Sequence, residues 1–123
     1  MTGLGELERR VMDVLWRSMG LQLTGRQVAD ELPDRAYTTV LTILERLRRK
    51  NLVERTTEGK AHRFAATASR ETYMAELMVE ALGSAHDRHA VLVRFAEVVS
   101  PEEADVLREA LEDLPDETGE KKP

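Results

Sequence analysis

Hydroxyl and cationic side chains share one face of the segment AYTTVLTILERLRRKNL at positions 36–52. On a helix that turns by about 100° per residue, this polar face collects Thr38, Thr42, Glu45, Arg46 and Arg49. The opposite, apolar face collects Val40, Ile43, Leu44 and Leu47. A threonine can exchange hydrogen bonds with a base edge and pack its methyl group on a thymine methyl, whereas an arginine neutralises phosphate. The segment therefore predicts a helix that contacts nucleic acid.

The start of this helix and the cations around it supply the candidate binding residues. We predict base contacts from Thr38, Thr39 and Thr42. We predict phosphate contacts from Arg26, Tyr37, Arg46, Arg49, Lys50, Arg55 and Lys60. Two alternatives stay open, because Thr39 could be a capping or partly buried hydroxyl and Tyr37 could close the core beside the turn. Arg48 points toward the apolar side, so we expect its stem to lie over the core.

The elements that would position these residues form a helix-turn-helix. LGELERRVMDVLWR has apolar residues at helical spacing and predicts a helix over residues 5–18. After a break at MGLQL, the pattern TGRQ from Thr24 to Gln27 is typical of a capping box and starts a short helix that Pro33 ends. The quoted segment follows the turn. A short helix, a tight turn and a second amphipathic helix are the layout of a helix-turn-helix.

Two short strands, LVERTT and KAHRFAA, follow the third helix and predict a hairpin. Closing it on Glu58 and Gly59 places Thr57 opposite Lys60, Val53 opposite Phe64, and Glu54 against Arg63. A basic hairpin directly after a recognition-like helix is typical of a wing. Without the preceding helices, a plain solvent-exposed hairpin would be the better interpretation.

Charge separates the two halves of the chain. The net charge is −5, but residues 1–70 carry 13 Lys or Arg against 9 Asp or Glu, whereas residues 71–123 carry 5 against 14. The basic half suits a polyanionic partner. A 41% apolar share favours a globular chain, and only 4% aromatic residues argues for helices over a β-sandwich.

Three amphipathic segments follow residue 69: SRETYMAELMVEALGSA, AVLVRFAEVV and SPEEADVLREALEDL. In the last, Ser100, Pro101 and Glu103 predict a capped start. Each predicted helix has a single apolar stripe, and three such helices form too thin a layer to bury their stripes among themselves. The simplest partner that could cover them is a second copy of the chain. The predicted dimer interface contains Leu77, Leu82, Leu92, Phe95, Leu107 and Leu111. The fold class is mainly α with a small β-hairpin: a winged helix over 1–68, a helical dimerisation region over 69–114 and a disordered tail over 115–123.

Other functions are less well supported. The chain has no cysteine, which excludes disulfides, thiolate metal centres and cysteine catalysis. No apolar run could span a bilayer and the N-terminus has no hydrophobic signal region, so we expect a cytoplasmic protein with no membrane partner. His86 and His89 have a spacing that could share a metal, but solvated connector histidines are the commoner case. Carboxylates lie on helical faces without catalytic partners, so we expect neither an enzyme nor a cofactor.

Four pieces of the sequence carry a family resemblance: LGELERRVMDVLW, AYTTVLTILERLRRKNLVER, GKAHRF with the following SRETY, and LVRFAE followed by SPEEADVLREAL. With this set in this order, nearly the whole chain resembles the penicillinase-repressor family, the BlaI, MecI and CopY type of bacterial winged-helix transcriptional regulator. The resemblance implies an N-terminal winged helix that binds a palindromic duplex DNA operator and a C-terminal region that forms a homodimer. It also implies repression by blocking transcription, commonly of genes for antibiotic or stress resistance.

The chain departs from the family pattern at two places. Copper-responsive members carry a cysteine-rich C-terminal motif, which is absent here. Members that respond to β-lactams are inactivated by a protease near an Asn-Phe pair, whereas this chain has Arg94 and Phe95 at the matching place. Release by a protease is therefore left open. Two further hypotheses also remain: a regulator of the multiple-antibiotic-resistance type that responds to a small effector, and a winged helix used only for protein contact.

Overall fold

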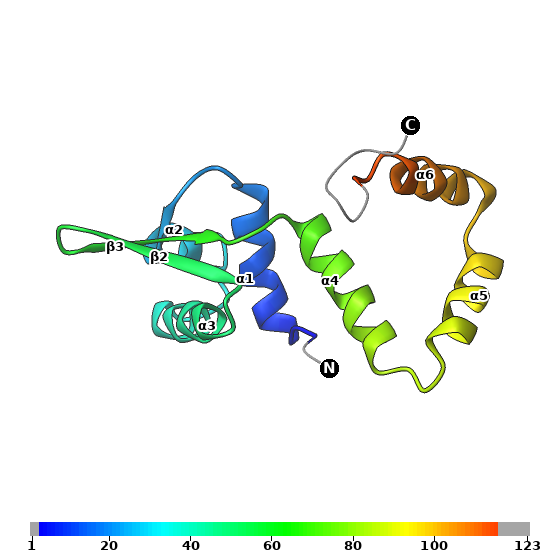
Figure 1. The fold of residues 1–123 in the computed structure, drawn as a ribbon. Helices are drawn as coiled ribbons and strands as arrows, with labels where there is room; N and C mark the ends of the chain where they lie inside the picture. The colour runs from blue at the N-terminus through cyan, green and yellow to red at the C-terminus, as the bar shows by residue number, and fades with distance from the viewer. Residues whose placement is uncertain (1–2, 116–123) are drawn as a thin grey trace. The chain divides into compact units, whose positions relative to one another are not determined.

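The computed structural model describes residues 3–115 of the 123-residue chain. Its elements in chain order are α1 (Glu6–Arg17), β1 (Leu23–Thr24), α2 (Gly25–Asp30), α3 (Tyr37–Arg49), β2 (Val53–Glu58), β3 (Ala61–Ala66), α4 (Arg70–Gly83), α5 (Arg88–Val98) and α6 (Pro101–Glu112). The mainly helical class with a small antiparallel sheet is therefore confirmed (Figure 1). Within the described residues no helix is both long and apolar enough to cross a membrane.

The helix starts follow the local signals in the sequence. Thr24 and Gln27 form the predicted capping box of α2: the Thr24 hydroxyl accepts from the Gln27 amide at 3.1 Å, and the Gln27 side chain accepts from the Thr24 amide at 2.8 Å. At the start of α1, Glu8 accepts from the amide of Gly5 at 3.0 Å. Helix α2 ends at Asp30, three residues before Pro33. These contacts satisfy amides that a helix start otherwise leaves unpaired.

The sheet contains a strand that the sequence patterns did not predict. Leu23, the last residue of the segment interpreted as a break, and Thr24, the predicted helix cap, form β1. This strand pairs with β3 and gives the antiparallel order β1-β3-β2. Two residues are too few to display an alternating pattern. This short strand connects the turn before α2 to Arg63 and Phe64, in the middle of β3.

The predicted hairpin register is wrong by two residues. Thr57 pairs with His62 rather than Lys60, and Val53 pairs with Ala66 rather than Phe64. The loop is Gly59 and Lys60, and Gly59 has φ of 62° at the first loop position, as a tight hairpin turn with glycine there requires.

Arg63 consequently pairs with Thr56 instead of Glu54. A shift of two residues keeps every side chain on its predicted face. Val53 and Phe64 are therefore still buried, as predicted.

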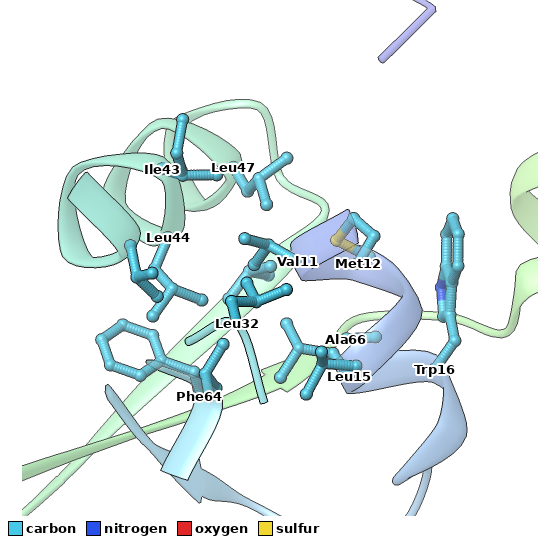
Figure 2. Packing of buried hydrophobic residues seen from close by; sticks show 14 of the residues in the cluster. Val11, Met12, Leu15, Trp16, Leu32, Ile43, Leu44, Leu47, Phe64 and Ala66 are labelled. Carbon is cyan, nitrogen blue, oxygen red and sulfur yellow. The ribbon is translucent and has the colours of Figure 1, made fainter. Parts of the chain in front are cut away.

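One core holds α1, α2, α3 and the base of the sheet together. Figure 2 shows the side chains of α1 and α3 facing each other, with Leu32 and Phe64 beside them. The buried apolar side chains include the whole apolar face of α3: Val40, Ile43, Leu44 and Leu47. Burying these four large side chains fixes the rotation of α3, so its polar face must point to solvent.

The first turns of α4 belong to the same core. Tyr73 is buried with its ring centroid 5.4 Å from that of Trp16, whose indole donates a hydrogen bond to the carbonyl of Ala68 at 3.2 Å. Arg70 pairs with Asp13 of α1 at 2.9 Å. The chain accordingly divides into a compact unit that ends at Glu80 and a second that begins at Ala81. The functional boundary predicted near residue 68 stays a prediction.

Within the second unit, α5 and α6 have caps but no buried side chain. Asp87 caps α5 by accepting from the amide of Ala90 at 3.0 Å, and Ser100 with Glu103 forms the predicted capping box of α6. Large apolar side chains on these helices remain exposed, among them Val91, Leu92, Val98, Val106, Leu107 and Leu111. The tail predicted over 115–123 lies, except for residue 115, outside the described residues.

Candidate nucleic-acid interface

The N-terminal half of α3 presents its threonines as the candidate base-reading surface. Thr38 and Thr42 are exposed and Thr39 is half-buried. The Thr42 hydroxyl donates to the carbonyl of Thr38 at 3.0 Å, and the side chain of Thr42 is exposed. Such a threonine can still accept a hydrogen bond from a base amino group and pack against a thymine methyl.

Gly25 allows α2 to approach α3 closely. A Cβ atom at Gly25 would lie 2.5 Å from Leu41 Cδ2 and 3.5 Å from the Tyr37 hydroxyl. Tyr37 is half-buried and packs against the core, and the Arg26 guanidinium lies 4.0 Å from its ring centroid. The structure thus brings two predicted phosphate ligands, Arg26 and Tyr37, together where α2 meets the start of α3. Their cation–π contact orients the Arg26 guanidinium.

The C-terminal half of α3 carries a cluster of cations around one carboxylate. Arg48 is half-exposed, and its Nε donates to Glu45 at 3.0 Å. That its stem lies over the core stays a prediction. Arg49 of the same helix and Arg55 of β2 each lie 3.7 Å from Glu45 oxygens. Arg46 is exposed and beside them. Sequence reasoning placed Glu45 on this face but missed its role in the cluster.

Lys50, at the end of α3, faces a different partner. Its ammonium donates to Glu8 at 2.8 Å, and Glu8 is 7% exposed. Burial raises the pKa of Glu8, but the hydrogen bonds from Lys50 and Gly5 outweigh it and hold that pKa below its usual value. The phosphate contact predicted for Lys50 stays a prediction, and it would have to compete with this ion pair.

The hairpin β2–β3 extends beyond the helices of its unit as a wing (Figure 1). Lys60 is exposed in its loop. On the same hairpin, Thr57 and His62 share a hydrogen bond of 3.1 Å. Arg63 Nε lies 3.4 Å from a carboxylate oxygen of Glu58. Cations therefore lie on α2, α3 and the wing, as a surface that contacts phosphates on both sides of a groove requires.

The residues predicted for the dimer interface fall into two groups. Leu77 packs against the core of the first unit. In the second unit Leu82 and Phe95 are half-buried, whereas Leu92, Leu107 and Leu111 are exposed. The core of the first unit therefore accounts for Leu77 within one chain. Leu82 lies at the end of α4, and the other four leucine and phenylalanine side chains lie on α5 and α6.

Residues 3–115 contain no group of three or more His, Cys, Asp or Glu side chains placed to hold a metal ion. The elements of the first unit form a helix-turn-helix followed by a wing, with hydroxyl and cationic side chains on the exposed face of the third helix. This combination defines the winged-helix class of transcriptional regulator.

Comparison with known proteins gives the family. The model of the penicillinase repressor family matches residues 4–113. The transcriptional regulator BlaI of Mycobacterium tuberculosis, in strains CDC 1551 and H37Rv, is 49% identical over 120 residues, covering 93% of this chain and 86% of the relative. The chain belongs to the penicillinase repressor family and is a winged-helix transcriptional repressor.

Solved structures agree on the fold. A mutant of Staphylococcus aureus MepR bound to an oligodeoxyribonucleotide aligns with a TM-score of 0.52 at 18% identity, covering 88% of this chain and 75% of that one. A structure of S. aureus MepR, a transcription regulator of the multidrug efflux pump MepA, aligns with a TM-score of 0.51 at the same identity and coverage. At this identity the likeness extends to the fold alone.

Proposed function

We propose that the chain represses transcription by binding a palindromic duplex operator as a homodimer, with α3 in the major groove and the wing along the backbone. The observation that carries this proposal is the exposed face of α3, where threonines precede a run of arginines. The N-terminal residues of a recognition helix reach base edges, and cations farther along reach phosphates. Binding, rather than catalysis, is the activity that this surface supports.

The proposed division of labour assigns base edges to Thr38, Thr39 and Thr42. It assigns phosphates to Arg26, Tyr37, Arg46, Arg49, Arg55 and Lys60, with Lys50 as a weaker candidate because it already pairs with Glu8. Seven further cations in residues 1–70 make the same unit attractive to a polyanion. We further propose that the operator controls resistance or stress genes in a bacterial cytoplasm.

The homodimer is proposed from the second unit. Described residues of α5 and α6 include no buried side chain, although several large apolar ones lie on them. An apolar surface of this kind marks an interaction site, and a second copy brings a matching surface of its own. A twofold dimer would present two α3 helices to half-sites about 10 base pairs apart, or a small multiple of that.

The first test selects DNA from a pool of randomised duplexes with the purified full chain. We expect a palindromic site, and we expect Thr39→Ala to relax preference by about 1–3 kcal/mol at one base pair per half-site. Arg46→Ala should weaken all duplexes alike and reduce the salt slope by about 1. Arg94→Ala removes an equal charge from α5, where the Arg94 side chain is 82% exposed. It is the matched control once sedimentation has shown that it dimerises like the unmodified chain. Indistinguishable profiles for Thr39→Ala and Arg46→Ala would contradict the assignment.

A further inference from the structure

Glu45 is an acidic side chain in the middle of a cationic surface. Its carboxylate makes a two-point contact with Arg48 of the same helix. It also lies 3.7 Å from Arg49 one position farther along α3 and 3.7 Å from Arg55 on β2. One carboxylate thereby links the recognition helix to the base of the wing through three guanidinium groups.

This carboxylate is ionised at neutral pH. The hydrogen bond from Arg48 holds the pKa of Glu45 below its usual value, and the charges of Arg48, Arg55 and Arg49 act in the same direction. The cluster of Glu45 with these three arginines therefore carries two net positive charges instead of three. Because the Glu45 side chain is 32% exposed, its charge is felt at the surface as well as within the cluster.

Glu45 also lies where a duplex would dock. Together with Leu41, Thr42, Arg46 and Arg49 it lines a shallow depression on the exposed side of α3. A glutamate can accept a hydrogen bond from the amino group of cytosine. Here, however, both oxygens already accept from Arg48, so a direct base contact would first have to break a two-point charged pair.

We propose that Glu45 is a positioning residue that sets the sequence specificity of this surface. It holds Arg49 and Arg55 in place for the phosphates of a cognate site, and its negative charge weakens the binding of every other duplex. The inference rests on the function proposed above.

The physical reason is that non-specific and specific binding depend differently on charge. Affinity for an arbitrary duplex follows the number of phosphates that free cations neutralise, so a carboxylate among those cations lowers it. At a cognate site, base contacts offset that loss. Specificity is the difference between the two affinities, and it increases when a repulsive element acts mainly on the wrong partner.

The test compares the full chain with Glu45→Gln, which keeps the shape of the side chain and removes its charge. Both proteins are titrated, over a salt series, with the selected palindromic site and with a scrambled duplex of equal length and composition. We expect the affinity of Glu45→Gln for the scrambled duplex to rise about threefold to tenfold, with a salt slope steeper by about 1. The affinity for the selected site should change less, so the ratio of the two affinities falls.

Glu54→Gln is the matched control, since Glu54 is an exposed carboxylate on β2 next to Arg55. Equal effects of Glu45→Gln and Glu54→Gln would overturn the proposal, because net charge alone would then explain both. An unchanged affinity ratio for Glu45→Gln would also overturn it.

Glu45→Asp supplies a second variant that keeps the charge but shortens the reach to Arg48. It should keep the salt slope of the unmodified chain on the scrambled duplex while losing part of the preference for the selected site. A steeper slope for this variant would contradict the electrostatic role. If the unmodified chain selects no duplex at all, the proposed function itself fails, independently of Glu45.

Discussion

Leu111→Glu tests whether α6 is buried against a second copy of the chain. The Leu111 side chain is 55% exposed in the single chain. Full burial of a leucine is worth about 1.5–3 kcal/mol, so covering the exposed half contributes about 1 kcal/mol per protomer. A twofold interface contains the site twice, which makes the loss about 2 kcal/mol per dimer on apolar area alone.

The introduced carboxylate adds a second cost. An unpaired charge in an apolar interface costs several kcal/mol, and the twofold axis places two of them in the same interface. A total of at least about 4 kcal/mol corresponds to a rise of about 1,000-fold in the dissociation constant of the dimer. We therefore expect a folded monomer at concentrations where the unmodified chain is dimeric.

Sedimentation equilibrium measures the dimer constant, and titration of the same sample with the selected site measures the consequence for DNA binding. Leu21→Glu is the control, because Leu21 is 63% exposed in the turn before β1 and is expected to lie outside the interface. Leu107→Glu should repeat the effect of Leu111→Glu. A Leu111→Glu protein that stays dimeric, or a monomer that binds the palindrome as tightly as the unmodified chain, would refute the reasoning.

Two further predictions concern ion pairs of the first unit. Glu8→Gln should lower the free energy of unfolding by about 1 kcal/mol in urea denaturation, because it removes a charged hydrogen bond to the half-exposed Lys50. In a Lys50→Met background, the same substitution should leave the free energy of unfolding unchanged. Because the folded pKa of Glu8 lies below its unfolded value, this stability is present above the unfolded pKa and is lost as pH falls through the folded one. The hydrogen bonds from Arg10 lower the pKa of Asp34 to about 2. NMR titration should show this value in the unmodified chain and a pKa near the usual one in Arg10→Gln.

Local chemistry in the sequence determined the helices and the surface that α3 displays. The capping boxes at Thr24 and Ser100 and the apolar spacing of α3 act over three or four residues, so they can be recognised without the fold. The same spacing also predicted which side chains of α3 would be exposed. The candidate base and phosphate ligands follow from that rotation.

Tertiary structure decided the features that depend on contacts between residues far apart in the sequence: strand pairing, hairpin register and ion-pair partners. The strand β1 exists because β3 pairs with it, and the hairpin register depends on which two residues fit the tight turn at Gly59. Likewise, the pairing of Lys50 with Glu8 spans 42 positions. The grouping of Arg55 with Glu45 needs the wing folded against α3. A local pattern specifies which face a residue occupies, but only packing specifies the side chain that meets it.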